Sequence, residues 1–256
     1  MKALITGASS GLGWDMAHEL SKRGYDIIAV ARREERLKAL KEELNTDVTI
    51  VCCDVSDIAQ CRELAKYASE VDILINNAGF GVFGDFLETD LDKELKMLDT
   101  NTRAMHILTK LYLEEFVKRD SGKILNVASI AAFFPGPRFS AYYATKAYVL
   151  RLSQSIAEEL RRKKSKVRIS VLCPGPVKTE FEHVASVSFG SDDEPLKNAI
   201  VLNSKDVAHF AIKKFLSGKL VIIPGTLMKI GAGLRHILPD KFLAKVLYII
   251  QSKKIK

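Results

Sequence analysis

Short apolar segments rich in Val and Ile alternate with longer amphipathic segments along most of this 256-residue chain. The short segments have the composition of buried β-strands, and we expect strands at 3–6, 26–31, 48–52, 73–76, 123–128, 167–173 and 220–223. The longer segments repeat apolar residues at helical spacing, and we expect helices at 12–23, 33–44, 57–69, 90–118, 140–163 and 204–217. This alternation predicts a single α/β domain, a doubly wound parallel sheet of seven strands with helices on both faces.

No repeat, low-complexity stretch or linker divides the chain before the Pro224-Gly225 pair. We therefore expect one domain over 1–225 and a separate tail over 226–256. The least regular stretch of the domain, 178–202, follows a late strand, and in open α/β sheets such loops border the ligand crevice. We interpret 178–202 as a mobile lid over a substrate site.

The tail region carries the positive charge of the whole chain, whose net charge is +8. Between 203 and 256, eleven Lys or Arg residues stand against two acidic ones, a net charge of +9, so 1–202 is close to neutral. Apolar residues recur at helical spacing from Phe242 to Ile250, which indicates a terminal helix packed on its own domain or on a second subunit. A peripheral contact with an anionic membrane is the alternative. No nucleic-acid motif accompanies these basic residues, so we expect no nucleic-acid partner.

Cysteine usage and the absence of targeting signals favour a cytoplasmic protein. No apolar run approaches the roughly 18 residues that cross a bilayer, and the first strand begins too early to leave room for a signal peptide. The four cysteines show neither metal-ligand spacing nor a disulfide framework. We expect reduced thiols and no metal site.

Three glycines, Gly7, Gly11 and Gly13, lie between the first strand and the first helix in a Gly-x-x-x-Gly-x-Gly pattern. Glycines allow a tight turn and let a pyrophosphate approach backbone N–H groups. The spacing differs from the Gly-x-Gly-x-x-Gly fingerprint, and the Gly-Lys-Ser/Thr of a P-loop is absent. The position of the pattern nevertheless predicts a dinucleotide site.

The end of the second strand indicates which dinucleotide binds. An acidic residue there would hold the ribose 2′-hydroxyl of NAD, but Ala31 has no carboxylate and Arg32-Arg33 follow it. Arg32 can pair with a 2′-phosphate, so we expect NADP(H) to be preferred over NAD(H). The alternative is that both arginines are merely solvated at a helix start.

Tyr142 and Lys146 are four residues apart in an expected helix, and such residues share one face. A free tyrosine titrates near about 10 and is a poor proton carrier at neutral pH. A fixed cation beside it stabilises the phenolate and lowers the pKa of the phenol. The pair is a candidate proton-transfer site, although many helices carry this pair by chance.

With these features, the chain resembles the classical short-chain dehydrogenase/reductase family over nearly all of 1–225. The motifs that carry the resemblance occur in the family's order: Thr6–Gly13, Asp54-Val55, Asn76-Asn77-Ala78-Gly79, Asn101, Ser129, Tyr142, Lys146 and Pro174-Gly175 with Thr179. The resemblance implies a Rossmann-type fold and a catalytic tetrad of Asn101, Ser129, Tyr142 and Lys146. It also implies that the cofactor is bound by Gly7, Ser9, Ser10, Gly11, Leu12, Gly13, Arg32, Asp54, Val55, Asn77, Ala78, Gly79, Tyr142, Lys146, Pro174, Gly175, Val177 and Thr179.

The family's roles for these residues form one mechanism. Tyr142 would exchange a proton with the substrate oxygen, and Lys146 would lower the pKa of that phenol and hold the nicotinamide ribose. Ser129 would hydrogen-bond the same oxygen, and Asn101 would anchor a water that links Lys146 to solvent. Tyr143 does not occupy the tyrosine position of the motif, so we expect it on another helix face, where it serves packing.

The resemblance implies NADPH-dependent reduction of a ketone or aldehyde, which in reverse is oxidation of an alcohol. Aromatic and proline residues near the tetrad and in the expected lid suggest a small apolar substrate: Phe133, Phe134, Pro135, Phe139, Phe181 and Phe189. The alternative is that several of them merely fill the core. Family members assemble as homodimers or homotetramers through two long helices, here 90–118 and 140–163. The alternatives are a non-catalytic NADP-binding redox sensor and a membrane-docked interaction protein.

Overall fold

The computed structural model describes residues 1–181, 201–235 and 237–252. The strands are Lys2–Thr6 (β1), Asp26–Ala31 (β2), Val48–Cys52 (β3), Ile73–Asn76 (β4), Lys123–Val127 (β5), Arg168–Leu172 (β6) and Val221–Ile222 (β7). The α-helices are Gly11–Ser21 (α1), Glu34–Glu43 (α2), Ile58–Glu63 (α3), Leu91–Leu98 (α4), Met105–Lys118 (α5), Ser140–Arg162 (α6), Ser204–Leu216 (α9), Thr226–Leu234 (α10) and Asp240–Ser252 (α11). Shorter helical turns occupy Leu64–Tyr67, Asp99–Ala104 and Ile130–Phe133.

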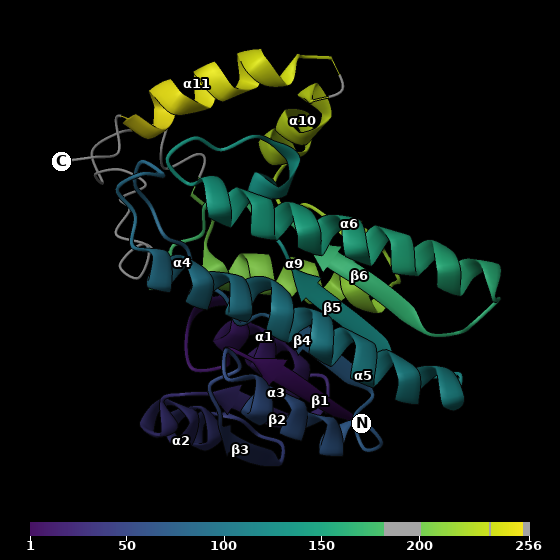
Figure 1. Cartoon of the computed structure of the whole chain (residues 1–256). Helices are drawn as coiled ribbons and strands as arrows, with labels where there is room; N and C mark the ends of the chain where they lie inside the picture. The colour runs from purple at the N-terminus through teal and green to yellow at the C-terminus, as the bar shows by residue number, and fades with distance from the viewer. Residues whose placement is uncertain (182–200, 236, 253–256) are drawn as a thin grey trace.

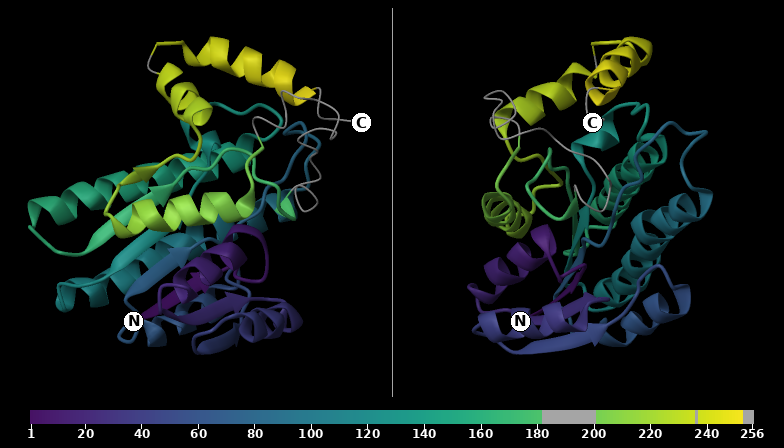
Figure 2. Two further views of the ribbon diagram at one scale, coloured as in Figure 1. Left: turned by 180° about the vertical axis from the view of Figure 1, so that it is seen from behind. Right: turned by 90° about the vertical axis from the view of Figure 1, so that its left-hand side faces the viewer.

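The strands form one parallel sheet in the order β3-β2-β1-β4-β5-β6-β7. Helices α1, α2 and α9 pack on one face of it, and α3, α5 and α6 pack on the other. Figure 2 shows these two helical layers on either side of the sheet. The chain forms β1 to β3 in one direction and then crosses from β3 to β4, so the strand order reverses between the neighbouring strands β1 and β4. Ligands bind open α/β sheets at the carboxyl ends of strands around such a point.

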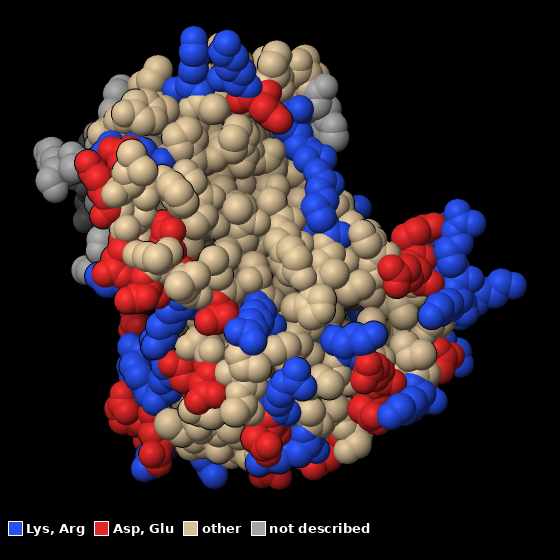
Figure 3. All heavy atoms as spheres, viewed as in Figure 1, with Lys and Arg blue, Asp and Glu red and all other residues tan. Residues whose placement is uncertain are grey.

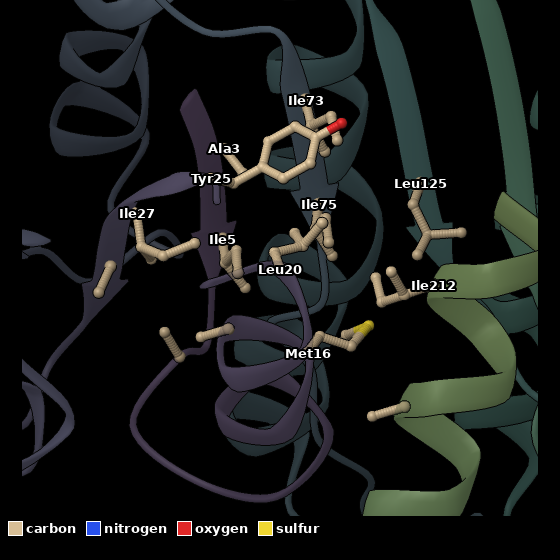
Figure 4. Close-up of a cluster of buried hydrophobic side chains, with 14 of the residues drawn as sticks. Ala3, Ile5, Met16, Leu20, Tyr25, Ile27, Ile73, Ile75, Leu125 and Ile212 are labelled. Carbon is tan, nitrogen blue, oxygen red and sulfur yellow. The ribbon is translucent and has the colours of Figure 1, made fainter. Parts of the chain in front are cut away.

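The strands are nearly continuous apolar runs because both faces of the sheet are covered. Figure 4 shows the core on one face, where α1 and α9 pack against β1, β4 and β5 through Met16, Leu20, Ile212, Ile5, Ile75 and Leu125. Each of these side chains is excluded from solvent, so the carboxyl ends of the central strands are held on a rigid base.

A buried ladder of polar side chains links the central strands to the helices beside them. Asn76 of β4 donates to Asn126 of β5 at 2.8 Å and to Thr109 of α5 at 3.1 Å. Asn126 in turn donates to Ser153 of α6 at 3.0 Å. The ladder therefore ties together four elements, two of which lead directly into candidate site loops.

The expected helix 90–118 is interrupted in the structure. Helix α4 ends at Leu98, a π-helical turn follows over Asp99–Ala104, and α5 then continues to Lys118. Similarly, the expected helix 57–69 consists of the short helix α3 and a 3₁₀ turn. Periodicity alone could not reveal the π-helical turn, which contains the candidate residue Asn101. Such turns are frequent at functional sites.

The tail forms two helices, α10 and α11, where the sequence suggested only one. Figure 1 shows α11 (yellow) crossing above α6. Most of the expected lid, 182–200, and Phe189 with it, lie outside the described residues. None of the described helices has both the length and the apolar character that a bilayer-spanning segment needs.

Candidate active site

A cavity of about 610 Å³ lies at the carboxyl ends of the strands, where α/β sheets bind ligands. The loops after β1 to β6 contribute to its wall, together with α4, α6 and α11. Among the described residues, no group of three or more His, Cys, Asp or Glu side chains is placed to hold a metal ion.

The loop between β1 and α1 is packed so closely that it requires glycine. A Cβ at Gly13 would overlap the backbone oxygen of Gly7 and lie 2.5 Å from Asn77 Nδ2. Gly7 itself has a φ of +68°, which residues with side chains rarely adopt. Asn77 Nδ2 donates to the backbone oxygens of Thr6 at 3.0 Å and Gly7 at 3.2 Å, so it joins this loop to the one after β4.

The amino end of α1 fits an anionic group. Its N-cap residue Ser10 makes no side-chain capping bond, and the first turn contains no acidic residue. Among the described residues, the first backbone N–H groups of the helix therefore have no capping side chain, and Ser10, Gly11 and Leu12 line the cavity. This cradle matches the pyrophosphate of the dinucleotide that the resemblance implies.

Charged side chains surround Asp54 at the end of β3. Its Oδ2 lies 3.4 Å from Lys96 Nζ and 3.9 Å from Arg32 Nη1. Burial raises the pKa of Asp54, but hydrogen bonds from Ser56 and the charge of Lys96 outweigh burial and bring the pKa below its ordinary value. Asp54 therefore remains an ionised hydrogen-bond acceptor in this wall of the cavity.

Arg33, the second arginine after β2, joins two walls of the cavity. Its Nη2 donates to Ser9 Oγ at 3.2 Å and pairs with Glu180 Oε2 at 2.8 Å. The bond with Arg33 lowers the pKa of Glu180 and keeps it ionised. The sequence pointed to Arg32 as the cofactor-binding arginine, but Arg32 is largely exposed. Arg33 is the one of the two that contacts the glycine loop.

Ser129, Tyr142 and Lys146 lie together where β5 meets α6. Burial raises the pKa of the Tyr142 phenol, and a hydrogen bond with Ser129 opposes this rise. Lys146 Nζ lies 5.7 Å from the centre of the Tyr142 ring and donates to the backbone oxygen of Val127 at 3.0 Å. Burial lowers the pKa of Lys146 to about 8.

These pKa shifts differ from the expectation that Lys146 lowers the pKa of Tyr142. Both side chains are enclosed, and the loss of hydration disfavours the phenolate and the ammonium alike. Burial is the largest cause of the raised pKa of Tyr142, and the charge of Lys146 is not among its causes. Tyr142 is held in its protonated form, in which it can act as a proton donor.

Asn101 fixes the loop after β4 against α6. Its Oδ1 accepts from Phe80 N at 3.0 Å, and its Nδ2 donates to Phe80 O at 2.9 Å and to Thr145 Oγ1 at 3.2 Å. A Cβ on Gly79 would lie 2.9 Å from Asn101 Oδ1 and 3.3 Å from Lys146 Nζ, so this glycine separates the two side chains. The water between Asn101 and Lys146 stays a prediction.

Tyr143 packs against the apolar cluster around Phe139 and Tyr142, as expected, but it also lines the same cavity as Tyr142, which the sequence did not suggest. The two rings are 6.3 Å apart at 73°. Gly136 leaves room for the Tyr143 ring, which a Cβ at that position would overlap. Tyr143 Oη also accepts a hydrogen bond from Gln251 Nε2 of α11 at 2.9 Å. Both contacts depend on the tertiary structure, which the helical period does not report.

Aromatic rings form the wall beside Tyr142. The Phe139 ring stacks on Tyr142 with centroids 4.5 Å apart, and the Phe181 ring lies 5.5 Å away. Phe80 and Phe83, which the sequence did not suggest, complete this wall. Three of the expected residues, Phe133, Phe134 and Pro135, do not line the cavity.

The structure brings most of the sequence-predicted residues to one cavity. Those in its wall are Gly7, Ser9, Ser10, Gly11, Leu12, Arg32, Asp54, Val55, Asn77, Ala78, Gly79, Ser129, Tyr142, Lys146, Pro174, Gly175, Val177 and Thr179. Gly13 and Asn101 lie behind the wall and support it. The sequence interpretation missed Lys96, Glu180 and Gln251, of which Gln251 had no local signal because it is 108 residues from its partner Tyr143.

Residues 1–187 match the short chain dehydrogenase family. The NADP-dependent 3-hydroxy acid dehydrogenase YdfG of Salmonella typhi is 33% identical over 217 residues, which cover 81% of this chain and 86% of that protein. A short-chain dehydrogenase from Sphingobium yanoikuyae in complex with NADPH has a TM-score of 0.79 and 29% identity, covering 93% of this chain and 96% of that one. A short chain dehydrogenase/reductase from Burkholderia phymatum in complex with NAD has a TM-score of 0.82 and 25% identity, covering 92% of each chain.

This protein belongs to the short-chain dehydrogenase/reductase family. The match confirms the resemblance and, with the parallel sheet, the Rossmann-type fold expected from the sequence. The chain is therefore an NAD(P)-dependent oxidoreductase acting between CH–OH and C=O groups.

Proposed function

We propose that this protein reduces an apolar ketone or aldehyde with NADPH and, in reverse, oxidises the corresponding alcohol. The observation that carries the proposal is the position of Tyr142, hydrogen-bonded to Ser129, in one cavity with the glycine loop. The aromatic wall formed by Phe139 and Phe181 supports an apolar substrate. Nothing in the described residues favours a non-catalytic sensor, because all four tetrad residues are present.

Bound NADPH would supply the hydride for the carbonyl carbon. We assign the proton on the carbonyl oxygen to Tyr142 Oη and a hydrogen bond to the same oxygen to Ser129 Oγ. Lys146 would hold the nicotinamide ribose from the floor of the site, where Val127 orients its ammonium. Asn101 would hold the loop after β4 beside α6 through its hydrogen bonds to Phe80 and Thr145, and so keep Gly79 next to Lys146.

The experiment that tests this proposal is a panel of ketones and aldehydes of increasing chain length, including 3-oxoacyl thioesters. Turnover would be followed at the nicotinamide absorbance with NADPH and, separately, with NADH. We expect apolar ketones or aldehydes to be reduced, with a higher kcat/KM with NADPH than with NADH. The absence of turnover with every member of the panel would contradict the proposal.

We further propose that Arg32 and Arg33 make NADPH the preferred cofactor. Arginine forms charge-assisted hydrogen bonds to phosphate, and NADH lacks the 2′-phosphate that these side chains would bind. The NADP-dependence of the Salmonella relative supports this assignment, although the NAD complex of the Burkholderia protein shows that the fold accepts either cofactor.

Replacing Arg32 or Arg33 with alanine is expected to raise the Kd for NADPH by about tenfold, the effect of losing one charge-assisted hydrogen bond. The Kd for NADH should change by less than about threefold. Tryptophan-fluorescence or calorimetric titration would measure both constants, with Arg161→Ala on the exposed side of α6 as the matched control. Equal weakening of both cofactors, or a wild-type preference for NADH, would show the assignment to be wrong.

We propose a homodimer that associates through α4, α5 and α6, with a homotetramer as the alternative. These helices share the face shown in Figure 3, where a broad area in the middle carries no charged side chain. The large apolar residues Leu95, Leu98, Val117 and Tyr148 are exposed on them. Sedimentation velocity should give about twice the 28.5 kDa mass of one chain, and a monomer at micromolar concentration would contradict the proposal.

A peripheral contact of α10 and α11 with an anionic membrane is our second proposal about partners. Both helices expose large apolar side chains: Leu227, Ile230, Leu234, Phe242, Val246, Tyr248, Ile249 and Ile250. Lys229, Lys241 and Lys245 on the same helices suit the anionic lipids of a cytoplasmic leaflet, which also supports a cytoplasmic location. The protein should sediment with phosphatidylserine vesicles more than with neutral ones, and equal sedimentation would contradict this proposal.

A further inference from the structure

The cavity contains a second polar pair, Tyr143 and Gln251, besides the candidate pair Tyr142 and Ser129. Gln251 Nε2 donates to Tyr143 Oη at 2.9 Å, and both residues line the cavity wall. Gln251 belongs to α11, which lies beyond the residues 1–187 that match the family. Of the pair, only Tyr143 lies within the residues that match the family model.

Burial makes Gln251 unusual among the residues of α11. The residue is only 2% exposed, although the apolar residues just before it, Ile249 and Ile250, are exposed. Its Oε1 is buried and has no hydrogen-bond partner among the described residues. Burial of an incompletely bonded amide is unfavourable. Turning the amide over exchanges its oxygen and nitrogen, so the unbonded atom becomes a donor whose burial a ligand oxygen would compensate.

The pair presents a hydrogen-bond donor that no described residue accepts. Burial raises the pKa of Tyr143 to about 12, so its phenol is protonated at neutral pH. Because Oη accepts from Gln251, the phenol hydrogen has to point elsewhere, and Tyr143 donates to no described acceptor. If the amide were turned over, the phenol would donate to it and the amide N–H groups would be the free donors.

We propose that Tyr143 and Gln251 form a second substrate subsite, which donates a hydrogen bond to an oxygen other than the reacting carbonyl oxygen. This inference rests on the proposed function, because it assigns a substrate class to the same cavity. The donors are neutral and lie beside aromatic rings, with Phe139 6.1 Å from Tyr143. The preferred substrate is accordingly a carbonyl compound with an apolar body and a second, uncharged oxygen acceptor, such as a ketone or ester group.

Two matched pairs of ketones test the subsite. Hexane-2,5-dione and heptane-2,6-dione would each be compared with the analogue in which a C=CH₂ group replaces the second carbonyl. This change removes the acceptor and keeps the shape. The measured quantity is the ratio of kcat/KM for the dione to kcat/KM for its analogue. The two compounds differ in chemical reactivity, but this difference is the same for every enzyme variant, so it cancels when the ratios of variants are compared.

The double variant Tyr143→Phe/Gln251→Leu removes every donor of the pair. In this variant we expect the kcat/KM ratio to fall about tenfold for at least one of the two diones, which differ in the distance between their carbonyl groups. Neither single variant should lower the ratio by more than the double variant does, because the two residues act as one unit. Tyr148→Phe, an exposed tyrosine of the same helix, should leave the ratio unchanged.

Ratios within about twofold of wild type in the double variant, at both spacings, would overturn the inference. A purely structural role would lower kcat/KM for both members of a pair alike and would give that result. Failure of the wild-type enzyme to reduce any of the four ketones would count against the proposed function instead.

Discussion

Replacing Tyr142 with phenylalanine is expected to lower kcat/KM for carbonyl reduction by about a thousandfold, the usual size of a lost general acid. The substitution removes one hydroxyl and keeps the ring that stacks on Phe139 at 4.5 Å. The cavity should therefore keep its shape, and the Kd for NADPH should change by less than about threefold. Initial rates at the nicotinamide absorbance and a binding titration would measure the two effects separately.

Two controls make this result specific. Tyr148→Phe on the same helix removes the hydroxyl of a tyrosine that is 42% exposed and bonded to His106, and it should retain full activity. Thermal unfolding should show that Tyr142→Phe is folded. A Tyr142→Phe enzyme with wild-type turnover would show that another group delivers the proton.

Gly13→Ala is expected to have the second large effect, because the added methyl group has no space. It would overlap the backbone oxygen of Gly7 and lie 2.5 Å from Asn77 Nδ2. Overpacking of this kind lowers the free energy of unfolding by about 2 kcal/mol. Displacement of Gly7 and Asn77 would also move the pyrophosphate cradle, so we expect the Kd for NADPH to rise more than tenfold.

Gly231→Ala is the matched control for this substitution. A Cβ at Gly231, inside α10, meets nothing within 4 Å. Alanine there should be neutral or stabilise the protein by up to about 1 kcal/mol, because alanine favours helix more than glycine does. Chemical unfolding with and without NADPH would separate stability from binding. If Gly13→Ala behaved like Gly231→Ala in both measurements, the cradle would not be as closely packed as the structure indicates.

The sheet could be predicted closely from the sequence because it depends on local patterns. Strands β2, β3 and β4 have the predicted bounds, and the others differ by a residue or two at their ends. Parallel strands covered on both faces are continuous apolar runs bounded by turn residues, and such runs are visible without tertiary information. The glycine loop was visible for the same reason, since its spacing is local.

The remaining parts of the site depend on contacts between distant residues. The π-helical turn around Asn101 coincides with its hydrogen bonds to Phe80, which follows another strand. The place of Tyr143 depends on Gly136 and on Gln251, and the pKa of Lys146 depends on its burial. Neither residue type nor spacing encodes these effects, so the place of Tyr143 in the cavity wall and the effect of burial on the pKa of Tyr142 could not be predicted.

The buried polar ladder has a consequence for how such a protein can evolve. Asn76 and Asn126 are followed within a few residues by Gly79 and Ser129, and Ser153 shares α6 with Tyr142 and Lys146. The ladder lies in the interior, whereas the aromatic wall lies on the loops and α6. The loops that line the cavity can therefore vary in sequence while the ladder keeps β4, β5 and α6 in register, which would let substrate preference change on a constant base.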